Sequence, residues 1–134
     1  MDKVQHFEIP VDDLDRAMAF YKETFGWHLQ NIPEMQYTII HTAPTDEKTG
    51  MIKEEALKEG GVINGGMMKR GEVKHPVITV IVEDIDRAKE KIEKNGGKMI
   101  NEKMEIPQMG WSAYFKDSEG NVMGLFQNVK GMKK

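Results

Sequence analysis

The chain repeats itself, and this repeat limits its fold more than any other feature of the sequence. Residues of the second copy stand 71 positions after their counterparts, in the pairs Val11 and Val82, Asp13 and Asp84, Asp15 and Asp86, Arg16 and Arg87, Ala17 and Ala88, and Gly26 and Gly97. A period near half of the 134 residues predicts two copies of one supersecondary unit.

The first copy, Val4 to Trp27, has the pattern of a strand, a cap, a helix and a glycine stop. Phe7, Ile9 and Val11 alternate with His6, Glu8 and Pro10, as in a strand with two different faces. Asp12 or Asp13 is suited to cap a helix. One helical face carries the apolar residues Leu14, Ala17, Met18, Tyr21 and Phe25, and Gly26 ends the helix. The Phe7 face is therefore predicted to pack under the helix, and the His6 and Glu8 face to line something else.

The rest of the first half predicts three more strands. They span His28 to Ile32, Gln36 to Pro44 and Gly61 to Met68, with a turn at Pro33-Glu34-Met35. The polar stretch Thr45 to Gly60 between them has the length of either a functional lid or a disordered loop, and a short helix fits inside it. The pair Gly65-Gly66 indicates a bulge or close approach by a ligand or another chain.

The second half predicts the same βαβββ order. Its elements are a strand Val77 to Val82, a helix Ile85 to Asn95 and three strands at Met99 to Ile106, Trp111 to Lys116 and Asn121 to Gln127. By analogy with the first copy, Ile78, Val80 and Val82 should face the helix, and Val77, Thr79 and Ile81 the open side. We expect a single domain over 1–134, with module 1 at about 1–70 and module 2 at about 75–130.

Composition excludes several kinds of function. The formal charge of −3, with both signs interspersed, argues against nucleic acid or an anionic membrane as partner. The absence of cysteine excludes disulfides, thiolate metal sites and cysteine nucleophiles. No apolar run reaches the length of a membrane span, so we expect a cytoplasmic protein. The 11 methionines suit soft core packing or an adaptable apolar pocket.

Three segments carry a resemblance to a known family. They are His6 to Asp13 with the downstream Phe20-Tyr21 and Phe25-Gly26-Trp27, then Val82 to Gly97, and Phe115 to Asn121. Together with the paired βαβββ units, they resemble the vicinal oxygen chelate superfamily of glyoxalase, bleomycin resistance and dioxygenase proteins, in particular the glyoxalase-like branch related to lactoylglutathione lyase. The resemblance implies an α+β fold in which two tandem βαβββ modules form a curved mixed sheet with a cleft. It also implies a homodimer.

The same resemblance implies positions for a divalent metal in that cleft. They correspond to His6, to Val77 as the repeat equivalent of His6, to Gly124 in the last strand and, in some members, to Asn64 or Gly65. Valine and glycine side chains cannot bind a metal, so we assign no metal ligand and no cofactor. A rebuilt divalent-metal site from His6, Glu8 and either His41 or His75 stays an open alternative.

The candidate catalytic residues are His6 and Glu8, which share one strand face as acid, base or ligand. Their alternative roles are a hydrogen-bonded remnant histidine and a paired carboxylate. The candidate lining of an apolar substrate pocket is Trp27, Met67, Tyr114, Phe126 and Gly124, where the missing side chain leaves room. Plain core packing is the alternative for the large apolar residues.

Two functions follow from these residues. One is a glyoxalase-like lyase or isomerase acting on a small organic molecule without the standard metal. The other is a non-catalytic homodimer that binds a small molecule, as an antibiotic-sequestering protein does. The sequence leaves open whether the chain is an enzyme, and a structural homodimer with a vestigial cleft is a third reading.

Overall fold

The computed structural model describes residues 1–46, 48 and 53–129. The chain divides into two compact units, and each is an α+β module. The first unit is His6–Pro76, and the second unit comprises Met1–Gln5 with the chain from Val77 onward. The strand β1 therefore begins in the second unit and runs through the first.

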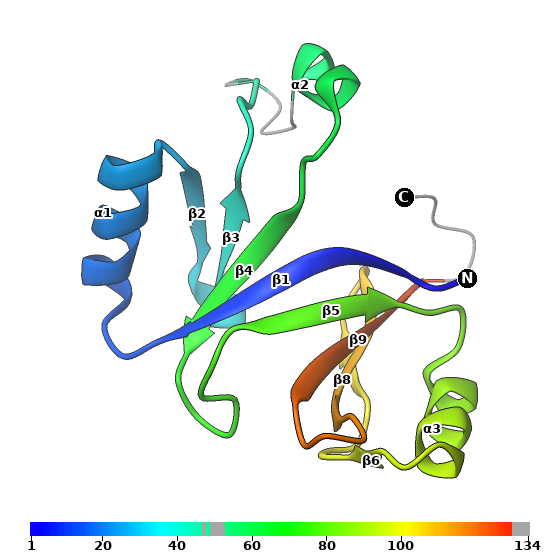
Figure 1. Ribbon diagram of the computed structural model, residues 1–134. Helices are drawn as coiled ribbons and strands as arrows, with labels where there is room; N and C mark the ends of the chain where they lie inside the picture. Colours follow the sequence, from blue (N-terminus) through cyan, green and yellow to red (C-terminus); the bar gives the residue numbers. More distant parts are fainter. Residues whose placement is uncertain (47, 49–52, 130–134) are drawn as a thin grey trace. The chain divides into compact units, whose positions relative to one another are not determined.

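The first unit follows the predicted βαβββ order (Figure 1). Its elements are β1 (Lys3–Val11), α1 (Leu14–Phe25), β2 (His28–Ile32), the 3-10 turn Pro33–Met35, β3 (Tyr37–His41), α2 (Glu54–Glu59) and β4 (Asn64–Lys69). Its strands lie in the order β2-β3-β4-β1. The pairs β2–β3 and β3–β4 are antiparallel, whereas β1 and β4 are parallel. The first strand of the module thus lies beside its last.

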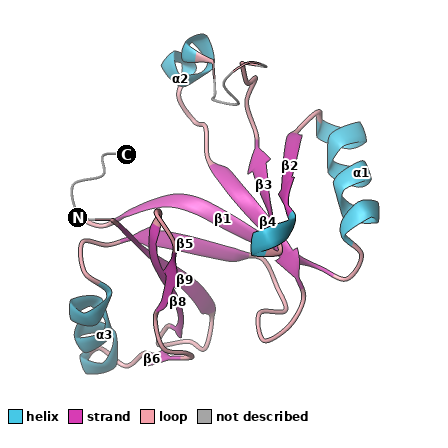
Figure 2. Cartoon of the chain, turned by 180° about the vertical axis from the view of Figure 1, so that it is seen from behind, coloured by secondary structure: helices cyan, strands magenta, loops and turns pink. Residues whose placement is uncertain are grey.

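The second unit repeats this arrangement (Figure 2). Its elements are β5 (Val77–Ile81), α3 (Ile85–Lys94), β6 (Lys98–Met99), β7 (Met104–Ile106), β8 (Gly110–Lys116) and β9 (Val122–Asn128). The strands lie in the order β5-β9-β8-β6, and β7 also pairs with β8. Here too the first and last strands, β5 and β9, are parallel neighbours.

The helix α1 begins and ends as its sequence predicts. Asp13 has an extended backbone, and its carboxylate accepts a hydrogen bond from the backbone N–H of Arg16 at 3.0 Å. Gly26 adopts the left-handed conformation with φ of 73°, and its N–H bonds the carbonyl of Lys22. An N-terminal aspartate and a left-handed glycine satisfy backbone groups that a helix end leaves unpaired.

The core of the first unit lies between α1 and one face of its sheet. Val11, Ile40 and Met67 are its buried members. The partly buried side chains packed on them are Phe7, Ile9, Leu14, Ala17, Met18, Tyr21, Trp27 and Leu29. The Phe7, Ile9 and Val11 face of β1 therefore packs against α1, as the alternation predicts, and the His6 and Glu8 face points away from it.

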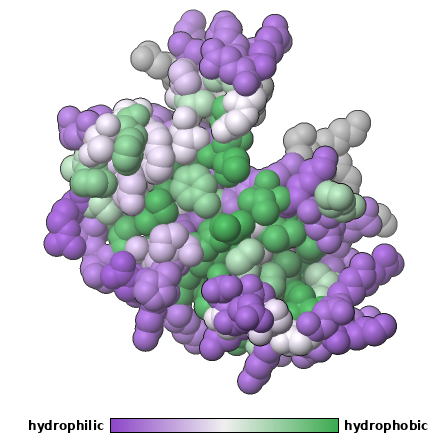
Figure 3. Space-filling model, in the orientation of Figure 1, coloured by the Kyte–Doolittle hydropathy of each residue, from purple (hydrophilic) through white to green (hydrophobic). Residues whose placement is uncertain are grey.

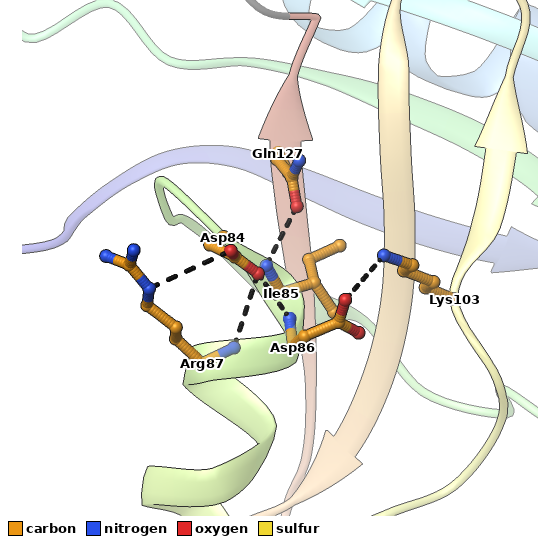
Figure 4. Close-up of polar contacts among 6 residues, drawn as sticks. All are labelled: Asp84, Ile85, Asp86, Arg87, Lys103 and Gln127. Atoms are coloured by element: carbon orange, nitrogen blue, oxygen red, sulfur yellow. Dashed lines mark hydrogen bonds and ion pairs between the residues drawn. The ribbon is translucent and has the colours of Figure 1, made fainter.

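Two side chains anchor the start of α3 (Figure 4). Asp84 accepts from the N–H of Asp86 at 2.8 Å, and the amide oxygen of Gln127 accepts from the N–H of Ile85 at 2.8 Å. The second contact joins the helix to β9. It also sets the helix over the core cluster of the second unit, which contains the buried residues Val82, Ile85, Ala113 and Leu125.

The second unit departs from two predictions. Ile78, expected to face the helix, is 49% exposed, because the cluster under α3 takes in Val80 and Val82 but not the start of β5. Val77 and Thr79, expected on an open face, are 1% and 5% exposed. The single strand predicted over Met99 to Ile106 is two short strands, β6 and β7, each paired with β8.

The polar stretch 45–60 contains the predicted short helix, α2. Ala56 is buried, and hydrophilic side chains cover the visible surface of this helix (Figure 3). The rest of the predicted lid or loop includes residues 47 and 49–52, which lie outside the described residues. In the described parts of the chain, no helix has both the length and the apolar character needed to span a membrane.

Candidate functional site

The candidate site lies on the face of the first unit's sheet that is turned away from α1. His6 and Glu8 are both half-buried there, on either side of Phe7, which packs into the α1 core. Residues two apart on a strand share one face. The two predicted catalytic side chains therefore point the same way from one rigid strand.

Tyr37, at the start of β3, reaches this pair from two strands away. The strand between them is β4, where Gly66 pairs with Glu8 on one side and with Ile39 on the other. A Cβ built on Gly66 would overlap the hydroxyl and ring of Tyr37. The phenol thus lies over the glycine, and the missing side chain lets it cross to β1.

The Tyr37 hydroxyl joins the two candidate residues by hydrogen bonds. It donates to Oε2 of Glu8 at 2.9 Å, and it lies 2.9 Å from Nε2 of His6. Because its hydrogen points to Glu8, the oxygen accepts from His6, which then carries its ring hydrogen on Nε2. Both hydrogens in this chain of contacts are directed toward the carboxylate.

The environment favours a neutral His6. Burial lowers the pKa of His6 below its ordinary value of 6.5, and the negative charge of Glu8 opposes this shift without reversing it. At neutral pH the imidazole is therefore a donor through Nε2 and an acceptor through Nδ1. A neutral imidazole, a phenol and a carboxylate in contact can hold or pass one proton.

Comparisons with known proteins agree with this architecture. A family model described as bleomycin resistance protein-like N-terminal matches residues 3–43. A glyoxylase-like domain-containing protein of Didymella fabae is 28% identical over 132 residues, covering 92% of this chain and 91% of that protein. Among solved structures, a hypothetical protein of Bacillus halodurans C-125 has a TM-score of 0.62 at 14% identity, covering 99% of both chains.

A second solved structure is a Streptomyces coelicolor methylmalonyl-CoA epimerase variant in complex with 2-nitronate-propionyl-CoA. Its TM-score is 0.61 at 16% identity, over 98% of both chains. The chain therefore has the two-module fold of the vicinal oxygen chelate proteins among these solved structures. Its sequence is similar to bleomycin resistance protein-like and glyoxylase-like proteins.

The positions that correspond to the superfamily's metal ligands in the second unit carry no ligand atoms. Val77 and Gly124 lie on the same side of neighbouring strands, as their parity predicts. The space beside Gly124, which was expected to be vacant, is filled. A Cβ there would lie 2.7 Å from the Thr79 hydroxyl and 3.3 Å from Cγ1 of Val77. That expectation was wrong because the β-branched neighbours on β5 occupy the volume.

Two of the predicted pocket-lining residues belong to the core instead. Met67 is fully buried in the cluster under α1, on the face opposite His6 and Glu8. Trp27 packs in the same cluster, with its ring stacked on that of Tyr21 at 5.1 Å between centroids. For both residues the alternative of core packing is correct. Met67 lies on the face of β4 that packs against α1, and Trp27 directly follows the end of α1.

The other two lining candidates share one face of the second unit. Tyr114 is the register partner of Gly124, and Phe126 follows Gly124 by two positions. Both side chains are half-buried. The structure thus groups Tyr114, Gly124 and Phe126 in the second unit, and His6 with Glu8 in the first.

Among the described residues of the first unit, no third ligand joins His6 and Glu8 to rebuild a metal site. Over residues 1–46, 48 and 53–129, no three His, Asp or Glu side chains gather closely enough to hold an ion. His41 is paired across β2 and β3 with His28. His75 is exposed and precedes β5. The group that does lie between His6 and Glu8 is the Tyr37 hydroxyl.

Sequence reasoning missed Tyr37. The sequence of β3 does not single out Tyr37, because its role depends on β4 lying between β3 and β1. The available signal was Gly65-Gly66, which predicts close approach of another group. The approaching groups are Phe7, whose Cε2 would lie 2.6 Å from a Cβ on Gly65, and Tyr37 over Gly66. Both come from neighbouring strands.

Proposed function

We propose that this protein is a glyoxalase-like enzyme that moves a proton next to the carbonyl of a small organic molecule, without the standard metal of its superfamily. The observation that carries the proposal is the Tyr37 hydroxyl, hydrogen-bonded to Glu8 and His6 on the sheet face turned away from α1. In this reading Glu8 is the base, Tyr37 the acid and His6 the residue that polarises Tyr37.

The geometry supports a balanced proton transfer. Glu8 takes the proton from the carbon beside the carbonyl, and the electron pair of the broken C–H bond moves onto the carbonyl oxygen as an enolate. A protonated Glu8 no longer needs the hydrogen of Tyr37, which can then turn to the enolate oxygen. His6 keeps donating through Nε2 to the Tyr37 oxygen and so makes that hydroxyl a stronger donor. Glu8 finally returns the proton to a carbon of the product.

The comparisons support a reaction of this class. The methylmalonyl-CoA epimerase structures are complexes with 2-nitronate-propionyl-CoA and with methylmalonyl-CoA. Epimerisation beside a carbonyl is a proton removal and return. For this chain the substrate class is carried over only as a small carbonyl compound, since the likeness lies in the fold.

The loss of the metal is part of the proposal. The residues do not fit the superfamily's site, because valine and glycine offer no donor atom and Thr79 fills the space beside Gly124. Of the positions His6, Val77 and Gly124, His6 supplies ring nitrogens, and its Nε2 is engaged with Tyr37. No step of the mechanism therefore runs through a metal.

The test is proton exchange in D₂O, followed by NMR on a panel of 2-oxo aldehydes, their thiol adducts and 2-substituted thioesters. Glu8→Gln should lose about 100-fold or more of the exchange rate, as removal of a general base does, and Tyr37→Phe about 10-fold or more. Glu23→Gln, an exposed carboxylate on α1, is the matched control and should exchange like wild type. Equal rates for Glu8→Gln and wild type would refute the assignment.

A second candidate is the non-catalytic binder. The match of residues 3–43 to the bleomycin resistance protein-like family favours it. Binding of small amphipathic drugs, measured by fluorescence of the two tryptophans, separates the readings. If Glu8→Gln leaves affinity intact and no panel member is turned over, the binder is correct. We propose that the protein is cytoplasmic and a homodimer in either case, and sedimentation velocity tests the homodimer.

A further inference from the structure

A second group of histidines lies at the far end of the β2–β3 pair. His28 begins β2 and His41 ends β3, and the two are direct partners in the antiparallel register. Directly opposed residues have Cβ atoms roughly 5 Å apart and project from the same face. The imidazole rings lie 5.5 Å apart between centroids, with their planes tilted by 34°.

The chain next to His41 is anchored, but the polar atoms of the His41 ring have no hydrogen-bond partner among the described residues. The chain directly after it is fixed by Thr42, whose N–H donates to Oδ1 of Asn64 at 3.1 Å and whose hydroxyl donates to the carbonyl of Ile63 at 2.7 Å. Both ring nitrogens of His41 are buried, and neither has a hydrogen-bond partner in the described part of the chain.

A buried nitrogen without a hydrogen-bond partner destabilises the fold, so it calls for a ligand. We propose that His28 and His41 together bind one divalent transition-metal ion. A metal–nitrogen distance of about 2.1 Å puts each ring centre roughly 3.2 Å from the ion, so two rings at a tetrahedral angle have centres about 5 Å apart. The observed 5.5 Å between centroids fits two rings on one ion.

The protonation of His41 suits this role. Burial lowers the pKa of His41, and the neighbouring His28 lowers it further. A neutral imidazole offers the lone pair that a metal needs. Binding an ion also satisfies a nitrogen that the fold leaves unpaired.

The donor set selects the class of ion. Imidazole nitrogen suits Zn²⁺, Ni²⁺ and Cu²⁺, whereas Mg²⁺ and Ca²⁺ prefer oxygen. Two histidines leave the other coordination positions to water, and His28 is exposed, so ions in solution can exchange with the site. The site is separate from the superfamily's metal positions at His6, Val77 and Gly124, and it does not depend on the proposed reaction.

The experiment is calorimetric titration of tag-free, chelator-treated protein with Zn²⁺ or Ni²⁺ alone, and with Mg²⁺ as the negative control. Wild type should bind one Zn²⁺ or Ni²⁺ per chain and no Mg²⁺. His28→Ala should weaken binding at least 10-fold, and because His28 is exposed this variant should fold normally. His41→Gln, checked by circular dichroism, should weaken it similarly. His75→Ala, which removes another exposed histidine, and His6→Ala should bind like wild type.

The absence of saturable binding in wild type would overturn the inference. So would equal affinity in wild type and His28→Ala. Loss of binding in His6→Ala alone would place the ion beside Glu8 and would refute this site in favour of the rebuilt one. None of these outcomes touches the proton-exchange assay, so the two proposals fail separately.

Discussion

Replacing Gly66 by alanine tests the arrangement of Tyr37 most directly. Gly66 does not have a positive φ, so its backbone accepts an alanine without strain. The new methyl group would occupy the place of the Tyr37 hydroxyl and ring. The phenol must then swing away from β1, and its contacts with Glu8 and His6 break together.

The size of the effect follows from those two contacts. A hydrogen bond to a neutral partner contributes about 1 kcal/mol and one to a carboxylate about 2 kcal/mol, so their loss costs about 3 kcal/mol. Alanine in place of a strand glycine returns roughly 0.5–1 kcal/mol. The free energy of unfolding should fall by about 2 kcal/mol, which moves the urea midpoint down by about 1 M.

The assay is a double-mutant cycle by urea unfolding. Gly66→Ala is measured in wild type and in Tyr37→Ala, where no phenol opposes the methyl group. In the second background the substitution should be neutral or slightly stabilising, which gives a coupling energy of about 2–3 kcal/mol. Gly65→Ala is the control, because its Cβ would meet the backbone carbonyl of Phe7 and its cost should not depend on Tyr37.

If Gly66→Ala lowers the free energy of unfolding equally in both backgrounds, this role of Gly66 is refuted. Such a result would mean that Gly66 is needed for its backbone and not for the passage of Tyr37. The hydrogen-bonded chain from His6 to Glu8 would then have no support from stability data.

Two further predictions concern the second unit and pH. Gly124→Ala should lower the free energy of unfolding by about 1–2 kcal/mol in urea titrations, because its Cβ would crowd the Thr79 hydroxyl. In a Thr79→Ala background most of this cost should disappear. An unchanged cost would contradict the contact between residues 79 and 124. Because burial lowers the pKa of His6 in the folded chain, the unfolded chain takes up the proton first as pH falls through 6.5. Stability should therefore be full above that pH and decline below it, by at most about 1.4 kcal/mol per pH unit for this group, until the folded pKa is passed. His6→Gln should show a shallower decline in urea midpoints between pH 8 and pH 5, and an equal decline would exclude His6 as a source.

Local chemistry was sufficient to predict the helices. Asp13 and Gly26 mark the start and the end of α1, because a capping carboxylate and a left-handed glycine act within a few residues. The repeat carried the same reasoning to α3. Where a prediction relied on the repeat alone it was weaker, and Ile78 is exposed although its counterpart Phe7 packs against the helix.

The candidate site was harder to predict because it depends on register between strands. Alternation placed His6 and Glu8 on one face correctly. It could not say that Tyr37 would reach them, which requires β4 between β1 and β3 with Gly66 at the crossing point. Met67 was assigned to the wrong face for the same reason, since parity within a strand leaves open which face meets the helix.

The parallel pairing of first and last strands has a consequence for how the chain is made. His6 pairs with Asn64 and Thr79 with Gly124, so each module closes through contacts 58 and 45 residues apart. Contacts between distant residues slow folding, since the intervening chain must be ordered first. During synthesis β1 leaves the ribosome long before its partner β4 exists. Until Lys69 has emerged, the edge of β1 that pairs with β4 has no partner strand. A chaperone can bind this edge during that time.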